Sequence, residues 1–367
     1  MNVLVVGVDA VGLMDATSII VTNFLTYYAK NRSNINFTFF GYSKNEGTQK
    51  IAPNIEAVSI QSPYEKPKFS FYRILRKTFY LIGLDSGTLT WHYCYRNFKK
   101  VLGKNNFDYV IAAAGCFEYA EAAFRYASKI HTPFVLMYFD SYSCSDFVKT
   151  RSSRLRREKR WYKLAIKILL CKDSARLPFE DVHHKAEYFY TPIFLKNRTY
   201  NPAGDIVFGG AFYPGFRPVS LANDFLKSFG ITKNKYSFYS NSREEILKRS
   251  DIKASDYIGN QEFAKICENA KAILVIGNGD KTKTMPSKFY DALSYRIPLI
   301  CLNFGPLQQE IEQLSICYSA YDPTCLEKID EVKQNDLDKF DVFKLMPERD
   351  PKVLSQTFDR LFLKTSE

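Results

Sequence analysis

The sequence predicts an α/β protein built from two doubly wound, Rossmann-like domains, and three observations support this. Short apolar, β-branched runs alternate with stretches of helical spacing in both halves of the chain. A chain of 367 residues exceeds the length at which single hydrophobic cores stop growing, so two domains are expected. The composition, with 46% hydrophobic and 25% charged residues, is that of a globular protein.

The first half of the chain alternates strand and helix from its beginning. The elements expected from this spacing are strands over 3–8, 36–42, 107–113 and 133–140 and helices over 17–30 and 118–130. Gly7 and Gly12 flank the loop after the first strand, but they do not form a GxGxxG motif. We therefore predict no dinucleotide site in this half.

The sequence also bears on compartment and metal content. It has no run of about 18 uninterrupted apolar residues, and its first seven residues have the pattern of a buried strand rather than a signal peptide. We therefore expect a cytoplasmic protein. The eight cysteines are scattered without a CxxC pair, so neither a disulfide framework nor a metal site is expected.

The most informative segment is 284–300, TMPSKFYDALSYRIPLI. Pro286 is suited to the first turn of a helix, where backbone N–H groups have no partner. The Ser287 hydroxyl and the Lys288 ammonium would add a donor and a charge beside these N–H groups, as a diphosphate requires. Asp291 lies one helical turn after Ser287, where its carboxylate could accept hydrogen bonds from sugar hydroxyls. An ordinary βαβ unit whose proline only begins a helix remains the alternative.

The flanking sequence places this helix in a strand, loop, helix, strand order. An apolar run over 272–276 precedes a polar loop over 277–285, and a second apolar run over 298–302 follows the helix. Ligands of parallel α/β sheets bind at the carboxyl ends of the strands, where this loop would lie. The segment therefore predicts a nucleotide-sugar site.

This order of residues resembles the donor-site signature of the GT-B glycosyltransferases, in particular the retaining, family-4-like bacterial members with a Pro-Ser-Lys motif. The resemblance implies that Ser287 and Lys288 bind the diphosphate and that Asp291 binds the ribose. It implies no metal ion and no cofactor besides the nucleotide-diphosphate sugar donor. The chain departs from the usual pattern in having Asp291 in place of Glu, and Tyr295-Arg296 where many members carry a small residue and Gly.

Two further segments resemble parts of the same donor domain. In 205–218, Gly209 and Gly210 would allow close backbone approach to a ligand, and Arg217 could bind phosphate through two donors. The alternative is that Arg217 is only a surface residue before a proline. In 255–263, Tyr257 and Ile258 would flank the nucleobase, which the resemblance implies is recognised by main-chain groups.

The domain boundaries follow from these assignments. Residues 1–198 are expected to form the acceptor domain and residues 199–349 the donor domain, with a linker over 190–204. The resemblance implies that the two domains face a cleft. The segment 350–367 has the apolar spacing of an amphipathic helix, and in GT-B folds the last helix crosses back to the N-terminal domain.

Positive charge is concentrated in the first domain. Residues 1–200 carry 29 Lys and Arg against 16 Asp and Glu, whereas residues 201–367 carry 22 against 23. Two basic, aromatic-rich segments, from Lys66 to Ile82 and from Lys149 to Lys167, would suit an anionic membrane surface at the inner face of the membrane. The alternative for each is a core helix with a solvated basic face. No nucleic-acid module is visible, so nucleic acid is not an expected partner.

The catalytic base is the least determined part of the prediction. An inverting enzyme needs a base near the acceptor hydroxyl, whereas a retaining one depends mainly on stabilising the leaving diphosphate. Asp140, at the end of a predicted strand, and Asp15, in the first loop, are the candidates, although each could equally be a cap or turn residue. Asp336 and Asp338 lie in a polar stretch expected to be solvated surface.

Together these patterns predict a glycosyltransferase. It would move a sugar from a nucleotide-diphosphate donor to a glycan or lipid-linked glycan in surface polysaccharide synthesis, with Arg217 and Lys288 offsetting the charge of the leaving diphosphate. Two alternatives remain open. One is a nucleotide-sugar epimerase of the same architecture, and the other is a non-enzymatic binding protein with a degenerate cleft.

Overall fold

The chain forms two compact α/β units. A computed structural model describes residues 1–9, 16–43, 46–61, 74, 78–79, 87–102, 106–113, 117–139, 151–173, 179–196, 199–215, 217–279 and 285–363. The first unit comprises Met1–Pro192 together with Pro351–Glu367, and the second comprises Ile193–Asp350. The units therefore change at 192/193 and 350/351, where the sequence prediction had placed the boundaries at 198/199 and 349/350.

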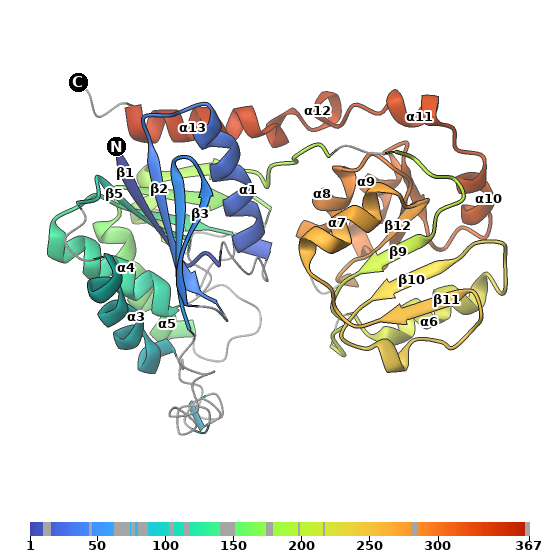
Figure 1. Cartoon of the computed structure of the whole chain (residues 1–367), viewed down its shortest axis with the longest axis horizontal. Coiled ribbons are helices and arrows are strands. Elements are labelled where there is room, and N and C mark those ends of the chain that lie inside the picture. The colour runs from blue at the N-terminus through green and yellow to red at the C-terminus, as the bar shows by residue number, and fades with distance from the viewer. Residues whose placement is uncertain are drawn as a thin grey trace. The chain divides into compact units, whose positions relative to one another are not determined.

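The first unit contains an eight-stranded sheet in the order β3-β4-β2-β1-β5-β6-β7-β8, in which only β3 is antiparallel to its neighbour (Figure 1). Its strands are β1 (Asn2–Val6), β2 (Asn36–Tyr42), β3 (Gly47–Ala52), β4 (Ile55–Ile60), β5 (Tyr109–Ala113), β6 (Phe134–Tyr138), β7 (Lys167–Cys171) and β8 (Ala186–Phe189). Its α-helices are α1 (Ala16–Lys30), α3 (Gly87–Leu102), α4 (Phe117–Ile130), α5 (Arg151–Leu164) and α13 (Pro351–Leu363).

Helices cover both faces of this sheet, which explains its continuous apolar strands. Every residue of β5 and β6 is buried, as expected of parallel strands with helices on each side. Phe37 of β2 contacts Phe362 of α13 on one face, whereas Phe40 of the same strand contacts Phe98 of α3 on the other. Successive strand residues point to opposite faces, so the odd and even positions of β2 pack against different helices.

The C-terminal helix α13 belongs to the first unit, although 158 residues of the second unit precede it in the chain. Phe358 is fully buried, with its ring 4.8 Å from that of Phe24 on α1. Asp359 accepts hydrogen bonds from Tyr28 Oη at 2.8 Å and from Arg32 Nη2 at 2.6 Å. The last helix is thus held by both an aromatic cluster and an ion pair.

Residues 151–164 of the basic segment from Lys149 to Lys167 form α5, and buried aromatic residues of this helix lie in the core. Trp161 and Tyr162 are fully buried, and Trp161 Nε1 donates to Oε2 of the buried Glu121 of α4 at 2.8 Å. Arg160 Nη2 donates to the same carboxylate at 3.0 Å. The structure therefore favours the alternative of a core helix with a solvated basic face. Of the segment from Lys66 to Ile82, nearly all lies outside the described residues.

The second unit contains a six-stranded parallel sheet in the order β11-β10-β9-β12-β13-β14. Its strands are β9 (Ile206–Gly209), β10 (Tyr236–Tyr239), β11 (Ile252–Ser255), β12 (Ala272–Ile276), β13 (Leu299–Leu302) and β14 (Cys317–Ser319). Its α-helices are α6 (Val219–Ser228), α7 (Asn260–Glu268), α8 (Ser287–Leu293), α9 (Gln308–Glu312), α10 (Cys325–Asp330), α11 (Gln334–Asp338) and α12 (Val342–Leu345). Counted within the unit, the strand order is 3-2-1-4-5-6, that of the Rossmann fold.

Replacing Phe358 with Ala should destabilise the first unit by about 3 kcal/mol or more, because the change leaves a cavity among fully buried rings. Both tryptophans, Trp91 and Trp161, lie in the first unit. Urea unfolding followed by tryptophan fluorescence therefore reports on this unit. Val353 on the same helix is 41% exposed, so Val353→Ala is the matched control and should cost under about 0.5 kcal/mol. Equal effects of the two changes would contradict the packing described for α13.

Candidate functional site

The candidate site lies at the carboxyl edge of the second sheet, where the strand order reverses between β9 and β12. These two strands pair only at Ile206 with Ala272 and at Val207 with Ile273. On its other side, β9 continues to pair with β10 as far as Gly209. The last residues of β9 therefore make no ladder contact with β12. In open α/β sheets this reversal point is where ligands bind.

Arg217 is held at this edge by the loop that follows β9. Tyr213 and Arg217 form a two-way backbone pair, with N···O distances of 2.8 and 2.9 Å, which closes a tight turn. The Arg217 side chain is only 7% exposed, and its Nη2 donates at 2.6 Å to Oδ1 of Asn278 in the loop after β12. Its buried Nε has no hydrogen-bond partner among the described residues. Burial lowers the pKa of the Arg217 guanidinium, and the two nearby tyrosines, Tyr213 and Tyr257, partly offset this.

Lys288 reaches the same edge from the first turn of α8. Its Nζ donates at 2.6 Å to the carbonyl oxygen of Gly209 and at 3.2 Å to the hydroxyl of Tyr257. The surrounding protein lowers the pKa of Lys288 to about 8, chiefly by desolvation and then by the charge of Arg217, while the charge of Asp291 acts in the opposite direction. The side chain nevertheless retains solvent-exposed surface. Lys288 is therefore a reachable cation that loses its charge more readily than an ordinary lysine.

Arg217 and Lys288 lie close enough for the charge of Arg217 to lower the pKa of Lys288. Within the described part of the chain, neither Arg217 nor Lys288 forms an ion pair. The two like charges therefore repel one another in the free protein, and an anion bound beside both would relieve the repulsion. The arrangement is therefore suited to a phosphate or diphosphate.

The glycines of the β9 loop have two different neighbours. A Cβ added to Gly209 would lie 2.4 Å from the ring of Phe263 on α7, so at this position glycine permits close packing of that helix. A Cβ added to Gly210 would lie 3.0 Å from the Phe208 ring and 3.1 Å from Lys288 Nζ. Gly210 therefore leaves room beside the lysine, whereas the Gly209 side of the chain is already filled by protein.

The other predicted donor-site residues lie in the loops around this edge. Tyr257, 52% exposed, and the half-buried Ile258 follow β11, and the Tyr257 ring lies 5.6 Å from Lys288 Nζ. Pro286 is the extended residue before α8, which begins at Ser287 and has seven residues. So short a helix has a small dipole, and the full charges of Arg217 and Lys288 dominate the local field. The Ser287 hydroxyl makes no hydrogen bond to the described residues.

Asp291 has a partner that the sequence did not indicate. Its Oδ1 accepts a hydrogen bond from Lys196 Nζ at 2.8 Å, and 43% of its side chain remains exposed. Sequence reasoning also missed Asn278 and Tyr213. The Gly-Asn-Gly sequence at 277–279, directly after a buried strand, was a signal for Asn278. No sequence pattern indicated Lys196, because it lies in the predicted linker and contacts Asp291, 95 residues away in the chain, only in the folded structure.

The candidate bases Asp15 and Asp140 lie outside the described residues. Asp336 and Asp338 are both exposed on α11, with Leu337 buried between them. Within the described ranges, no three His, Cys, Asp or Glu side chains are grouped so that they could hold a metal ion.

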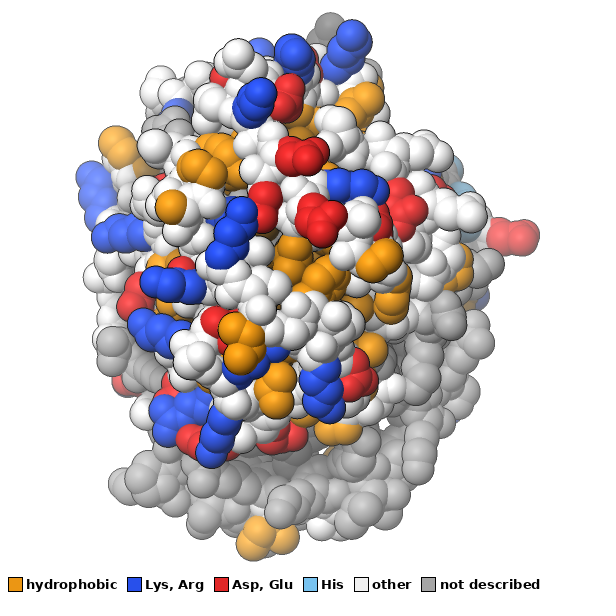
Figure 2. Space-filling view, turned by 90° about the vertical axis from the view of Figure 1, so that its right-hand side faces the viewer, with side chains coloured by type: hydrophobic (Ala, Val, Ile, Leu, Met, Phe, Trp, Pro, Cys, Tyr) orange, Lys and Arg blue, Asp and Glu red, His pale blue; other side chains and the backbone are white. Residues whose placement is uncertain are grey.

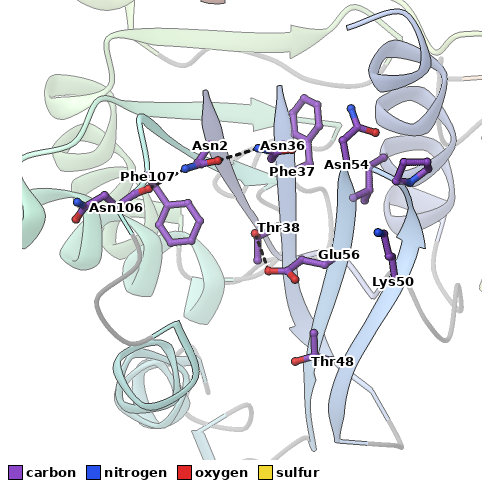
Figure 3. Close-up of a pocket in the computed structure, with 12 residues that line it drawn as sticks. Asn2, Asn36, Phe37, Thr38, Thr48, Lys50, Asn54, Glu56, Asn106 and Phe107 are labelled. Atoms are coloured by element: carbon purple, nitrogen blue, oxygen red, sulfur yellow. Dashed lines mark hydrogen bonds between the residues drawn. The ribbon is translucent and has the colours of Figure 1, made fainter. Parts of the chain in front are cut away.

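A cavity of about 640 Å³ lies in the first unit, at the amino ends of its parallel strands (Figure 3). Asn2 and Asn36, at the amino ends of β1 and β2, line it and are hydrogen-bonded to each other at 3.1 Å. Thr38 donates to Glu56 at 3.3 Å on the same surface. Ligands of such sheets bind at the carboxyl ends of the strands. This cavity therefore does not lie where a ligand of the first sheet is expected, and it belongs to a different unit from the candidate site.

In the face drawn in Figure 2, Lys and Arg side chains are interspersed with Asp and Glu and with small apolar groups. No helix among the residues that the structure describes is long and apolar enough to cross a bilayer.

Comparison with known proteins identifies the fold. No protein-family model and no curated protein sequence matches the chain. Among solved structures, sucrose-phosphate synthase from Thermosynechococcus elongatus is similar over 99% of this chain and 100% of its own, with a TM-score of 0.59 and 10% identity. The lipopolysaccharide outer core galactosyltransferase WaaB covers 100% of both chains at a TM-score of 0.52 and 13% identity. Anabaena HepE, solved in complex with UDP, covers 99% of this chain and 100% of its own at 0.56 and 10%.

The chain therefore has the fold of the GT-B glycosyltransferases, with two Rossmann-like domains and a last helix that returns to the first. This confirms the predicted fold class. At these identities the likeness concerns the fold alone, and the site must be judged from its own residues.

The reactivity of the Lys288 amine should titrate with a midpoint near pH 8, because only the neutral amine is acylated and burial lowers the pKa to about 8. The measurement is the rate of acetylation of the peptide containing Lys288, followed by mass spectrometry from pH 6 to 10. Arg217→Gln removes a like charge and should raise the midpoint, whereas Asp291→Asn removes an opposite charge and should lower it. A midpoint that neither substitution moves would contradict the electrostatic coupling of the three groups.

Proposed function

We propose that the protein is a glycosyltransferase that moves a sugar from a nucleotide-diphosphate donor to a glycan or lipid-linked glycan acceptor. The observation that carries this proposal is the convergence of Arg217 and Lys288 at the switch point of a Rossmann-type sheet, with neither cation in an ion pair among the described residues. The GT-B fold supports the reaction class, since one of the similar structures is the galactosyltransferase WaaB and another is HepE in complex with UDP.

In this proposal the two cations bind the donor diphosphate and stabilise the charge that develops on it as the glycosidic bond breaks. Such preorganised charges are typically the largest contribution to catalysis when a group leaves as an anion. Ser287 and the N–H groups around Pro286 would add neutral donors, and Gly209 and Gly210 would form the wall beside the diphosphate. No metal ion and no cofactor is proposed, because two protein cations already face the diphosphate.

The nucleoside would occupy the neighbouring loops. Tyr257 and Ile258 would flank the base, and the exposed part of the Asp291 carboxylate would accept hydrogen bonds from the ribose. Asp15 and Asp140 stay the candidates for a base on the acceptor side. If the reaction retains configuration, no such base is needed and stabilisation of the leaving group is the main requirement.

The acceptor that we propose is a glycan or lipid-linked glycan of a surface polysaccharide, assembled on the cytoplasmic face of a membrane. Lys159, Arg160 and Lys163 of α5 are exposed, whereas the aromatic residues of that helix are buried. Any contact of α5 with a membrane would therefore be electrostatic, with anionic headgroups, and not by insertion of apolar side chains.

Binding of a nucleoside diphosphate is the first expected outcome. We expect one of the diphosphates UDP, GDP and dTDP to bind the wild-type protein in calorimetry, with CMP, a monophosphate, as the fourth nucleotide tested. Lys288→Ala and Arg217→Ala should each weaken binding about 10- to 100-fold, the contribution of one or two charge-assisted hydrogen bonds to phosphate. Lys339→Ala, which removes an exposed lysine that is 79% solvent-accessible, is the matched control and should leave the affinity unchanged. Failure of all four nucleotides to bind would argue for a degenerate binding protein.

Turnover then separates the proposed transferase from an epimerase. With the sugar donor of the identified nucleotide, release of the nucleoside diphosphate should require an added glycan or polyprenyl-linked glycan acceptor, and Lys288→Ala should lower kcat/KM about 100-fold. Chromatography of the donor sugar shows directly whether the donor has been interconverted or hydrolysed. Interconversion or hydrolysis of the donor at the same rate without acceptor would favour the epimerase alternative.

A further inference from the structure

Lys196 is fixed against the end of α8 by backbone contacts. It lies between the last strand of the first unit and the first strand of the second, in the second unit. Its N–H donates to the carbonyl oxygen of Ser294 at 3.0 Å, and its carbonyl oxygen accepts from Arg296 Nη2 at 3.5 Å. The start of its side chain is therefore positioned by the helix that carries Lys288 and Asp291.

The Lys196 ammonium makes three contacts within a small space. Its Nζ donates to Asp291 Oδ1 at 2.8 Å and to the Tyr295 hydroxyl at 2.7 Å, and it lies 4.2 Å from the centre of the Tyr295 ring. Tyr295 is only 1% exposed and lies beside the buried Cys267 thiol. A rigid, buried ring thus supports the lysine, and the lysine in turn restricts the carboxylate.

The Asp291 side chain remains partly exposed in this arrangement. Oδ1 is held by Lys196, whereas the side chain as a whole is 43% exposed. The carboxylate also influences Lys288, whose pKa its charge raises. Asp291 therefore lies in the same site as the lysine that we place on the diphosphate, with Oδ1 held by Lys196 and 43% of its side chain exposed.

The residues after α8 account for this geometry. Tyr295 supplies the hydroxyl and ring that hold the ammonium, and Arg296 donates to the Lys196 carbonyl while adopting a positive φ of 52°. These are the two positions at which the chain departs from the small residue and Gly of the GT-B signature. Both departures contact Lys196, so they belong to one structural device.

We propose that Lys196 is a positioning residue for the donor nucleotide. By holding Oδ1, it orients the Asp291 carboxylate so that the second oxygen, Oδ2, accepts hydrogen bonds from the ribose hydroxyls. Aspartate is one methylene shorter than glutamate and has one fewer rotatable bond. Contact with a ligand therefore depends more strongly on the orientation of its carboxylate. The inference rests on the proposed function, because it assumes that a nucleotide binds at this edge.

The test compares a nucleotide with its form that lacks the ribose hydroxyls. The probes are the nucleotide that binds the wild type, among the four named above, and its analogue without the 2′- and 3′-hydroxyls. Lys196→Met, which keeps the side-chain length and removes the charge, should weaken binding of the hydroxylated form about tenfold, the contribution of one hydrogen bond to a charged group. Binding of the analogue should be unchanged. Lys196→Arg should restore most of the loss.

Two further variants separate positioning from a general structural effect. Asp291→Asn should reproduce the selective loss, and adding Lys196→Met to it should cause no further loss, since no carboxylate remains to be oriented. Lys339→Met is the matched control for removing a lysine charge, and melting temperatures show that each variant is folded. Equal loss for both probes in Lys196→Met, or no loss at all, would overturn the inference while leaving the proposed function intact. Binding of neither probe to the wild type would overturn both.

Discussion

The early end of the pairing between β9 and β12 is the constraint on which the candidate site depends. The two strands share only two residue pairs, although β9 runs on to Gly209 and β12 to Ile276. The Gly209 carbonyl oxygen is consequently free to accept Lys288, and the loops after the two strands are joined by Arg217 and Asn278 instead of by a ladder. A parallel sheet with this strand order opens a ligand site at its carboxyl edge because neighbouring loops turn in opposite directions there.

The electrostatics of the second unit follow from this geometry. Arg217 and Lys288 influence one another without forming an ion pair among the described residues, while Asp291, whose charge also acts on Lys288, is held by Lys196. A carboxylate left free at this position could neutralise Lys288 and so compete with a bound anion. Pairing Asp291 with a cation from the linker keeps the positive charge of Lys288 in the same site as the acceptor that we propose for the sugar hydroxyls.

Several elements of the fold were predictable from local pattern. The predicted strands at 36–42 and 272–276 coincide with β2 and β12, and the final helix with α13, because uninterrupted apolar runs and period-3.6 spacing survive in any tertiary context. The β3–β4 hairpin was not predicted, since the exposed β3 lacks the alternation of buried and solvated positions. The basic helix α5 was recognised as amphipathic, but its pattern could not tell whether the apolar face meets a bilayer or the buried Glu121 and its neighbours. Both surroundings favour the same residue types.

The sequence by itself determined the fold class and the residue types that we propose for phosphate binding, because strand runs, a proline at a helix start and adjacent Ser and Lys are local features. Only the tertiary structure decided which charges meet. Arg217 and Asn278 are 61 residues apart, Lys288 and Gly209 are 79 apart, and Lys196 and Asp291 are 95 apart. Contacts at such separations depend on how parallel strands are ordered in the sheet, and a single sequence carries no local signal of that order.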